Sequence, residues 1–127
     1  MFEILPNLAT CSIFESYTPE GWIIVDVRDL IDDAGNSVDE VGKKIELVAN
    51  LLCSGHKVVV RCQAGMSRSN TIACAALLWC RVFPTWNETW NLIKEKCPRA
   101  MLSMGFYDTV KEASLKRLNI PNDWFEP

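Results

Sequence analysis

The chain has 127 residues, of which 49% are hydrophobic and 23% charged, as expected for one compact domain over residues 1–127 with a sizeable core. Its formal net charge is only −3, so no strong positive field attracts nucleic acid or an anionic membrane surface, and we expect neither as a partner. No apolar run is long enough to cross a bilayer and the N-terminus lacks the pattern of a secretory signal, so we expect a cytoplasmic, monomeric protein.

Short apolar segments in the first half of the chain predict the strands of a sheet. Residues 4–11 (ILPNLATC) are expected to form two short strands around a turn at Pro6 and Asn7. Residues 22–27 (WIIVDV) and 57–61 (KVVVR) are rich in β-branched side chains and are predicted to be buried strands.

A helix is predicted between the last two of these strands. Ser37 and Glu40 form a capping box, in which the hydroxyl and the carboxylate close the first helical turn. Apolar residues then recur at helical spacing as far as Leu52, and Gly55 ends the segment. A strand, a helix and a strand in this order form a βαβ unit, which implies parallel strands joined by a right-handed crossover.

The second half of the chain predicts three helices. Residues 68–81 form an apolar helix that Pro84 breaks. A second capping box at residues 85–88 begins a helix that stops at Pro98, and a last helix is expected at residues 106–118. The predicted fold is therefore α/β, with a small, largely parallel sheet flanked by helices.

The chemistry is expected where the strand at residues 57–61 ends. Cys62 follows that strand, and five residues separate it from Arg68, which opens the next helix. Ligands of open α/β sheets bind at this position. A short loop that leads into a helix N-terminus turns successive backbone N–H groups inward, and Gly65 allows the tight curl. The segment therefore predicts a cradle for an anion such as phosphate.

A phosphate in this cradle would lie against the sulfur of Cys62. The N–H groups and Arg68 favour the thiolate over the thiol, and the planar fork of Arg68 can hold two phosphate oxygens into the transition state. The hydroxyl of Ser69 can reach the sulfur when the thiolate is the leaving group. These residues together predict an activated cysteine nucleophile.

Three segments carry a resemblance to a known family. The stretch CQAGMSRS, residues 62–69, is similar to the C-x-x-x-x-x-R-[ST] loop of the cysteine-dependent protein tyrosine phosphatases, and most similar to their dual-specificity branch. ILPNLATCS, residues 4–12, resembles the opening segment of that branch. KEKCPRAMLSMGF, residues 94–106, resembles its later segment, which contains Arg and Pro and ends in Gly-Phe.

The resemblance implies a compact dual-specificity-phosphatase-like fold and a protein phosphatase. Such an enzyme hydrolyses phosphotyrosine, and phosphoserine or phosphothreonine, in phosphoprotein substrates through a phosphocysteine intermediate, without a metal or other cofactor. The resemblance implies Cys62 as the nucleophile, Arg68 as the arginine that stabilises the transition state and Ser69 as the residue that assists the leaving sulfur. The implied phosphate-binding loop consists of Gln63, Ala64, Gly65, Met66, Ser67 and Arg68.

Two features depart from the family pattern. Arg61 stands where relatives usually have a histidine directly before the cysteine, and we expect it to be a structural or solvated cation rather than a catalytic one. The connection between Val27 and the helix at Val38 is short, so a strand usually found there is expected to be absent or merged with its neighbour.

The resemblance also implies a general-acid aspartate on a loop after an earlier strand. Asp29 is chosen for its position shortly after the strand at residues 22–27, and Asp32 is the second choice. Asp26 lies inside that strand and is expected to be structural. Because the connection is shortened, spacing alone does not decide between the first two aspartates.

The other cysteines are expected to be structural. None of the six is spaced as C-x-x-C and the chain has one histidine, so no metal site is predicted. A domain of this size needs no disulfide framework, so most of the cysteines are expected to be small buried hydrophobic side chains.

Three other functions remain open from the sequence. A rhodanese-like sulfurtransferase also uses a loop cysteine, and IIVDVRD resembles an early strand of that fold, but its loops are typically one residue shorter; sulfur transfer from thiosulfate would identify it. An inactive phosphate-binding module is disfavoured by the intact Cys62, Arg68 and Ser69, and turnover of an aryl phosphate would exclude it. Phosphatases of lipid or RNA phosphates often carry Lys or further Arg in the loop, where this chain has neutral residues.

Overall fold

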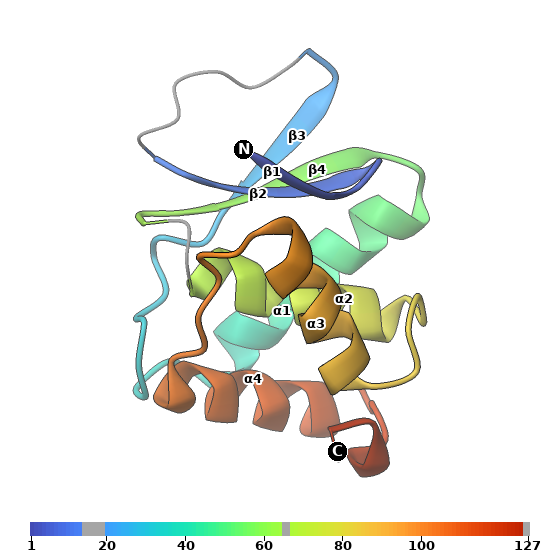
Figure 1. The fold of residues 1–127 in the computed structure, drawn as a ribbon. Coiled ribbons are helices and arrows are strands. Elements are labelled where there is room, and N and C mark those ends of the chain that lie inside the picture. The colour runs from blue at the N-terminus through green and yellow to red at the C-terminus, as the bar shows by residue number, and fades with distance from the viewer. Residues whose placement is uncertain (14–19, 65–66, 126–127) are drawn as a thin grey trace.

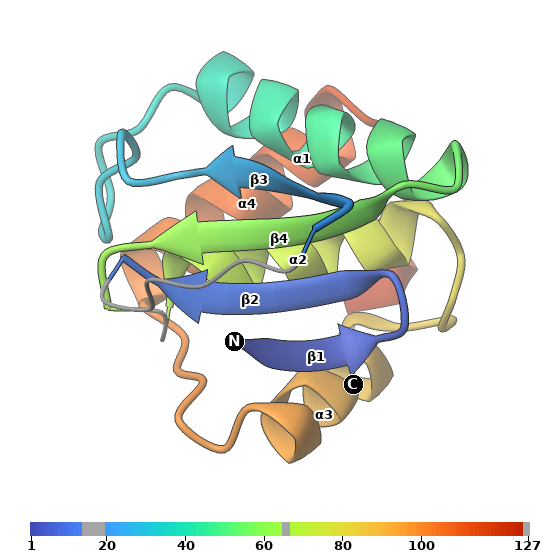
Figure 2. The same cartoon turned by 90° about the horizontal axis from the view of Figure 1, so that it is seen from above.

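The architecture is a four-stranded sheet with helices packed on it (Figure 1), in a computed structural model that describes residues 1–13, 20–64 and 67–125. The strands lie in the order β1-β2-β4-β3, which Figure 2 shows from above. β2, β4 and β3 are parallel to one another and β1 is antiparallel to β2, so the predicted small, largely parallel sheet is confirmed. The strands are β1 (Phe2–Leu5), β2 (Leu8–Ser12), β3 (Trp22–Asp26) and β4 (Lys57–Cys62).

The described helices lie on one face of the sheet (Figure 1). Two boundaries differ from the predicted ones. The last long helix begins at Met104 rather than at residue 106, and the helix that follows β4 ends at Trp79. Within the described residues, none of the helices is both long and apolar enough to cross a membrane. The helices are α1 (Val38–Cys53), α2 (Arg68–Trp79), α3 (Trp86–Lys96), α4 (Met104–Lys116) and a short 3₁₀ helix, η1 (Asn122–Phe125).

Local signals set the helix ends as predicted. The Ser37 hydroxyl accepts a 3.1 Å hydrogen bond from the backbone N–H of Glu40, and Thr85 does the same for Glu88 at 3.2 Å. At the other end of α1, Gly55 adopts φ 84°, a left-handed conformation that strains most other residues.

β4 and α2 form the centre of the molecule. Val58, Val59 and Val60 of β4 are completely buried between β2 and β3. α2 is buried from Ser69 to Leu78, because it packs against β4 and β2 and is surrounded by α1, α3 and α4. A central strand thus leads directly into a central helix, and the loop between them is fixed at both ends.

Candidate active site

The Cys62 thiol lies at the carboxyl end of β4, where open α/β sheets bind ligands. Its side chain is buried, and the thiol donates a 3.3 Å hydrogen bond to Oγ of Ser69 in the first turn of α2. From the side of β2, the backbone N–H of Ile13 donates to the carbonyls of Cys62 and Gln63 at 3.1 and 3.3 Å. The structure thus brings together the predicted nucleophile and the predicted hydroxyl.

Buried hydrogen bonds anchor the start of α2 to the sheet. The Thr10 hydroxyl on β2 donates to Oδ1 of Asn70 at 2.8 Å. The Thr71 hydroxyl donates to the backbone carbonyl of Ser67 at 2.7 Å, which ties the last loop residue to the helix. Because these groups are fully buried, their geometry holds the helix N-terminus in place beside the sulfur.

Arg68 is held by the segment between β3 and α1, residues 27–36, which we call the acid loop. Its Nη1 donates to the backbone carbonyl of Leu30 at 2.7 Å and to that of Arg28 at 3.2 Å. A guanidinium carries further N–H donors on Nε and Nη2, in the planar geometry that suits two phosphate oxygens. These two backbone carbonyls of the acid loop therefore fix the orientation of the guanidinium.

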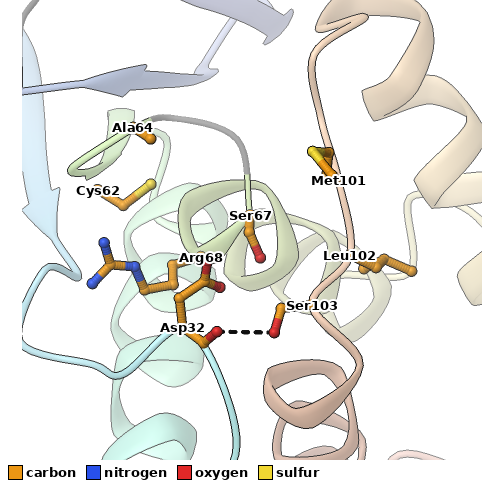
Figure 3. A pocket seen from close by; sticks show the side chains of 8 residues that line it. All are labelled: Asp32, Cys62, Ala64, Ser67, Arg68, Met101, Leu102 and Ser103. Atoms are coloured by element: carbon orange, nitrogen blue, oxygen red, sulfur yellow. Dashed lines mark hydrogen bonds between the residues drawn. The ribbon is translucent and has the colours of Figure 1, made fainter.

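A pocket of about 250 Å³ opens above the sulfur (Figure 3). Ser67 contributes a buried hydroxyl oxygen that has no hydrogen-bond partner among the described residues. Gln63 and Ala64 are exposed, whereas the predicted loop members Gly65 and Met66 lie outside the described residues. The pocket is lined by Asp32, Cys62, Ala64, Ser67, Arg68, Met101, Leu102 and Ser103.

The wall opposite the cysteine comes from the segment before α4 and was not predicted from the sequence. Met101 and Leu102 contribute its apolar part, and Figure 3 shows this segment across the opening from Cys62 and Ser67, with the Leu102 side chain pointing away from them. The Ser103 hydroxyl donates a 2.9 Å hydrogen bond to the backbone carbonyl of Asp32, which joins this wall to the acid loop. These residues carry no catalytic motif, and only the family resemblance of residues 94–106 pointed to the segment.

The two candidate general acids occupy different places. Asp32 lines the pocket together with the nucleophile. Asp29 has a side chain that is 66% exposed, pairs with Lys44 at 3.4 Å, and faces a separate open hollow shared with Arg28 and Gln63. The geometry therefore favours Asp32, the second choice from the sequence, over Asp29.

Asn36 holds the acid loop in its conformation. Its Oδ1 accepts from the backbone N–H of Ile31 at 2.7 Å, and its Nδ2 donates to the Ile31 carbonyl at 2.7 Å and to that of Asp33 at 3.3 Å. The loop also packs on the first turn of α4, where a Cβ atom at Gly105 would overlap Asp33 and the backbone of Ala34. Asn36 and Gly105 thus position the loop that carries Asp32.

Arg61 and Asp26 form an ion pair across β4 and β3. Arg61 Nη2 donates to Asp26 Oδ2 at 2.9 Å, and Arg28 donates to the same carboxylate through Nε and its backbone N–H. Burial raises the pKa of Asp26, but the hydrogen bonds from Arg28 and Arg61 outweigh it and lower the pKa to about 2. Asp26 therefore stays ionised at neutral pH, in line with the structural role expected for it and for Arg61.

The described residues contain no group of three or more His, Cys, Asp or Glu side chains that could hold a metal ion.

Comparison with known proteins gives consistent matches. The sequence matches the family described as dual specificity phosphatase, catalytic domain, over residues 7–116. Protein 123R of Invertebrate iridescent virus 6, which is named as a tyrosine phosphatase, is 29% identical over 97 residues, or 75% of this chain and 67% of the viral one.

Two human crystal structures share the fold. DUSP28 superposes with a TM-score of 0.75 at 16% identity, covering 94% of this chain and 99% of that one. The tyrosine phosphatase-like serine/threonine/tyrosine-interacting protein superposes with a TM-score of 0.63 at 19% identity, covering 93% and 97%. At these identities the likeness concerns the fold.

Proposed function

The chain belongs to the dual-specificity phosphatase family and is a phosphatase domain, and from this premise we propose that it acts on phosphoproteins through a phosphocysteine intermediate on Cys62. Phosphotyrosine is the proposed main substrate, with phosphoserine and phosphothreonine accepted as well. The observation that carries the proposal is the buried Cys62 thiol, hydrogen-bonded to Ser69, in a pocket that Arg68 and Asp32 also line.

In the first step, the Cys62 thiolate attacks phosphorus. The S–P bond forms while the P–O bond to the substrate side chain breaks, and the departing oxygen takes a proton from Asp32. Arg68 holds two of the phosphoryl oxygens as their charge redistributes. Because the acid loop bonds Arg68 through its backbone carbonyls, the acid and the arginine are positioned by one segment.

In the second step, water attacks the phosphocysteine and gives a proton to the Asp32 carboxylate that the first step left ionised, which restores the acid. The new P–O bond forms, the S–P bond breaks, and inorganic phosphate leaves with Cys62 as the thiolate. The Ser69 hydroxyl can then turn its hydrogen toward the sulfur and stabilise the negative charge, since the two atoms lie 3.3 Å apart. Ser69 therefore acts mainly on the breakdown of the intermediate.

The pocket walls support protein rather than lipid or RNA phosphates as substrates. Gln63, Ala64 and Ser67 add no positive charge to that of Arg68, so the site suits a single phosphate group. Met101 gives the wall an apolar side chain against which a tyrosine ring can pack. We further propose that the enzyme is cytoplasmic and monomeric. We also propose that it needs no metal, because the cysteine chemistry requires none.

The intermediate is tested by trapping. Wild type, Ser69→Ala and Cys62→Ser are mixed with a radiolabelled phosphotyrosine peptide and quenched in acid within one turnover. We expect little labelled enzyme in wild type, more in Ser69→Ala because breakdown is slowed, and none in Cys62→Ser. Label retained on Cys62→Ser would contradict the assignment of the nucleophile.

The substrate class is tested with a panel of phosphotyrosine, phosphoserine and phosphothreonine peptides, a phosphoinositide and a 5′-phosphorylated RNA. We expect the highest kcat/KM for phosphotyrosine peptides. A preference for the lipid or the RNA would overturn the substrate class while leaving the phosphatase family intact. Thiosulfate serves as the control for sulfur transfer, and no cyanide-dependent thiocyanate formation is expected.

A further inference from the structure

Two cysteines outside the active site lie sulfur to sulfur. Cys53 is the last residue of α1, and Cys80 is the residue that caps the C-terminal end of α2. Their Sγ atoms are 3.1 Å apart, and both thiols are free. A disulfide bond measures about 2.05 Å between the sulfurs, so a movement of roughly one ångström separates this contact from a covalent bond.

Rigid elements hold this pair together. α1 and α2 pack side by side in the core, and the backbone N–H of Cys80 closes the end of α2 on the carbonyl of Ala76 at 3.0 Å. The Cys80 thiol also contacts the carbonyl of Ala49 on α1 at 3.6 Å. Because the two cysteines lie at the ends of helices that already pack together, the sulfurs can approach by side-chain rotation without a change of fold.

The two thiols differ in their access to solvent. Cys53 is exposed, whereas Cys80 is half-buried. Burial, together with the hydrogen bond and the charge of Cys53, raises the pKa of the Cys80 thiol to about 12. An oxidant in solution therefore reacts with Cys53 first, and the Cys80 thiol lies beside it to attack the oxidised sulfur.

We propose that Cys53 and Cys80 are a site of reversible oxidation, at which hydrogen peroxide closes a disulfide between α1 and α2. The Cys53 thiolate attacks one peroxide oxygen, the O–O bond breaks, and Cys53 becomes a sulfenic acid with release of hydroxide. The Cys80 sulfur then attacks the Cys53 sulfur, the S–S bond forms, and the sulfenic oxygen leaves and takes up the Cys80 proton as water. In sum, two thiols are oxidised and one peroxide is reduced to two waters.

This site is separate from the catalytic cysteine. Cys62 precedes α2 and Cys80 follows it, and α2 has 12 residues, which places about 18 Å of helix between the pocket and the cysteine pair. The disulfide therefore leaves the pocket unchanged and joins two core helices. Oxidation of Cys62 abolishes turnover, whereas oxidation of Cys53 and Cys80 stabilises the fold, so the two events have different readouts.

The linkage is tested on the full chain. Cys62→Ser removes the competing catalytic thiol, and this variant is treated with hydrogen peroxide, alkylated, digested without reduction and analysed by mass spectrometry. We expect a peptide pair joined through Cys53 and Cys80 that is lighter by two hydrogen atoms and is released by a thiol reductant. Cys53→Ser in the same background must lose this linked peptide pair. Cys11→Ser, a control substitution in strand β2, must keep it.

Thermal unfolding gives the second readout. The bond closes a loop between residues 53 and 80 and so constrains the unfolded chain. Oxidation is therefore expected to raise the Tm by several degrees, up to roughly 10 °C, and Cys53→Ser is expected to show no rise. Full alkylation of Cys53 and Cys80 after peroxide treatment, or a link from Cys53 to another cysteine, would overturn the proposal. A link without any rise in Tm would also overturn it, because the bond would then strain the helices rather than fit them.

Discussion

Replacing Asp32 by Asn tests the assignment of the general acid. Asn keeps the size of the side chain and leaves the backbone carbonyl free to accept the hydrogen bond from Ser103, so the acid loop should retain its conformation. The substitution removes the carboxyl proton that the acid would donate and leaves a side chain of similar size and shape. We therefore expect kcat for phosphoserine and phosphotyrosine peptides to fall by about 10²–10⁴-fold, the usual contribution of general acid–base catalysis.

The assay uses pH and leaving group together. A general acid must be protonated, so the wild-type rate should fall as the pH rises, and Asp32→Asn should lose this alkaline limb. The loss of rate should shrink for aryl phosphates with very good leaving groups, because these need little protonation. Circular dichroism and vanadate affinity should stay close to wild type, since neither depends on the proton.

Asp29→Asn is the matched control. Asp29 is mostly exposed and pairs with Lys44 outside the pocket, and an exposed ion pair of this kind contributes about 0–1 kcal/mol. We expect its variant to keep the alkaline limb and to change kcat only slightly. If Asp29→Asn removes the limb and Asp32→Asn keeps it, our reasoning from the pocket geometry is refuted.

Three further changes test the surroundings of the site. Asn36→Ala should loosen the acid loop and lower kcat by roughly 10- to 100-fold, and steady-state kinetics beside vanadate affinity will show whether the acid and Arg68 lose their positions together. Gly105→Ala places a methyl group against the acid loop and should cost about 1–3 kcal/mol of unfolding free energy as well as kcat, which urea unfolding and kinetics measure. Asp26, with a folded pKa of about 2 against about 3.9 unfolded, stabilises the fold above pH ~4 and loses this contribution as the pH falls toward 2. Asp26→Asn should therefore cost about 1 kcal/mol at pH 7, after allowance for solvent screening, and the difference from wild type should narrow in urea titrations below pH ~4.

The parts of the protein that are local in the chain could be predicted from the amino-acid sequence. The apolar strand at Val58–Val60 and the apolar helix beyond the loop bracket Cys62, Arg68 and Ser69 so closely that their order alone places them together. The capping boxes at Ser37 and Thr85 likewise acted within a single helical turn. For these elements the information lies within a few residues, so periodicity and spacing were sufficient.

Features that depend on partners far apart in the sequence could be assigned only from the fold. The acid loop has no hydrophobic period, and its course is set by Asn36, by Ser103 and by the close approach of Gly105. For this reason, spacing along the chain pointed first to Asp29, whereas the fold brings Asp32 into the pocket. The pocket wall before α4 and the pairing of Cys53 with Cys80 arise in the same way, because helices that are remote in sequence pack side by side and no local pattern records which of their residues will touch.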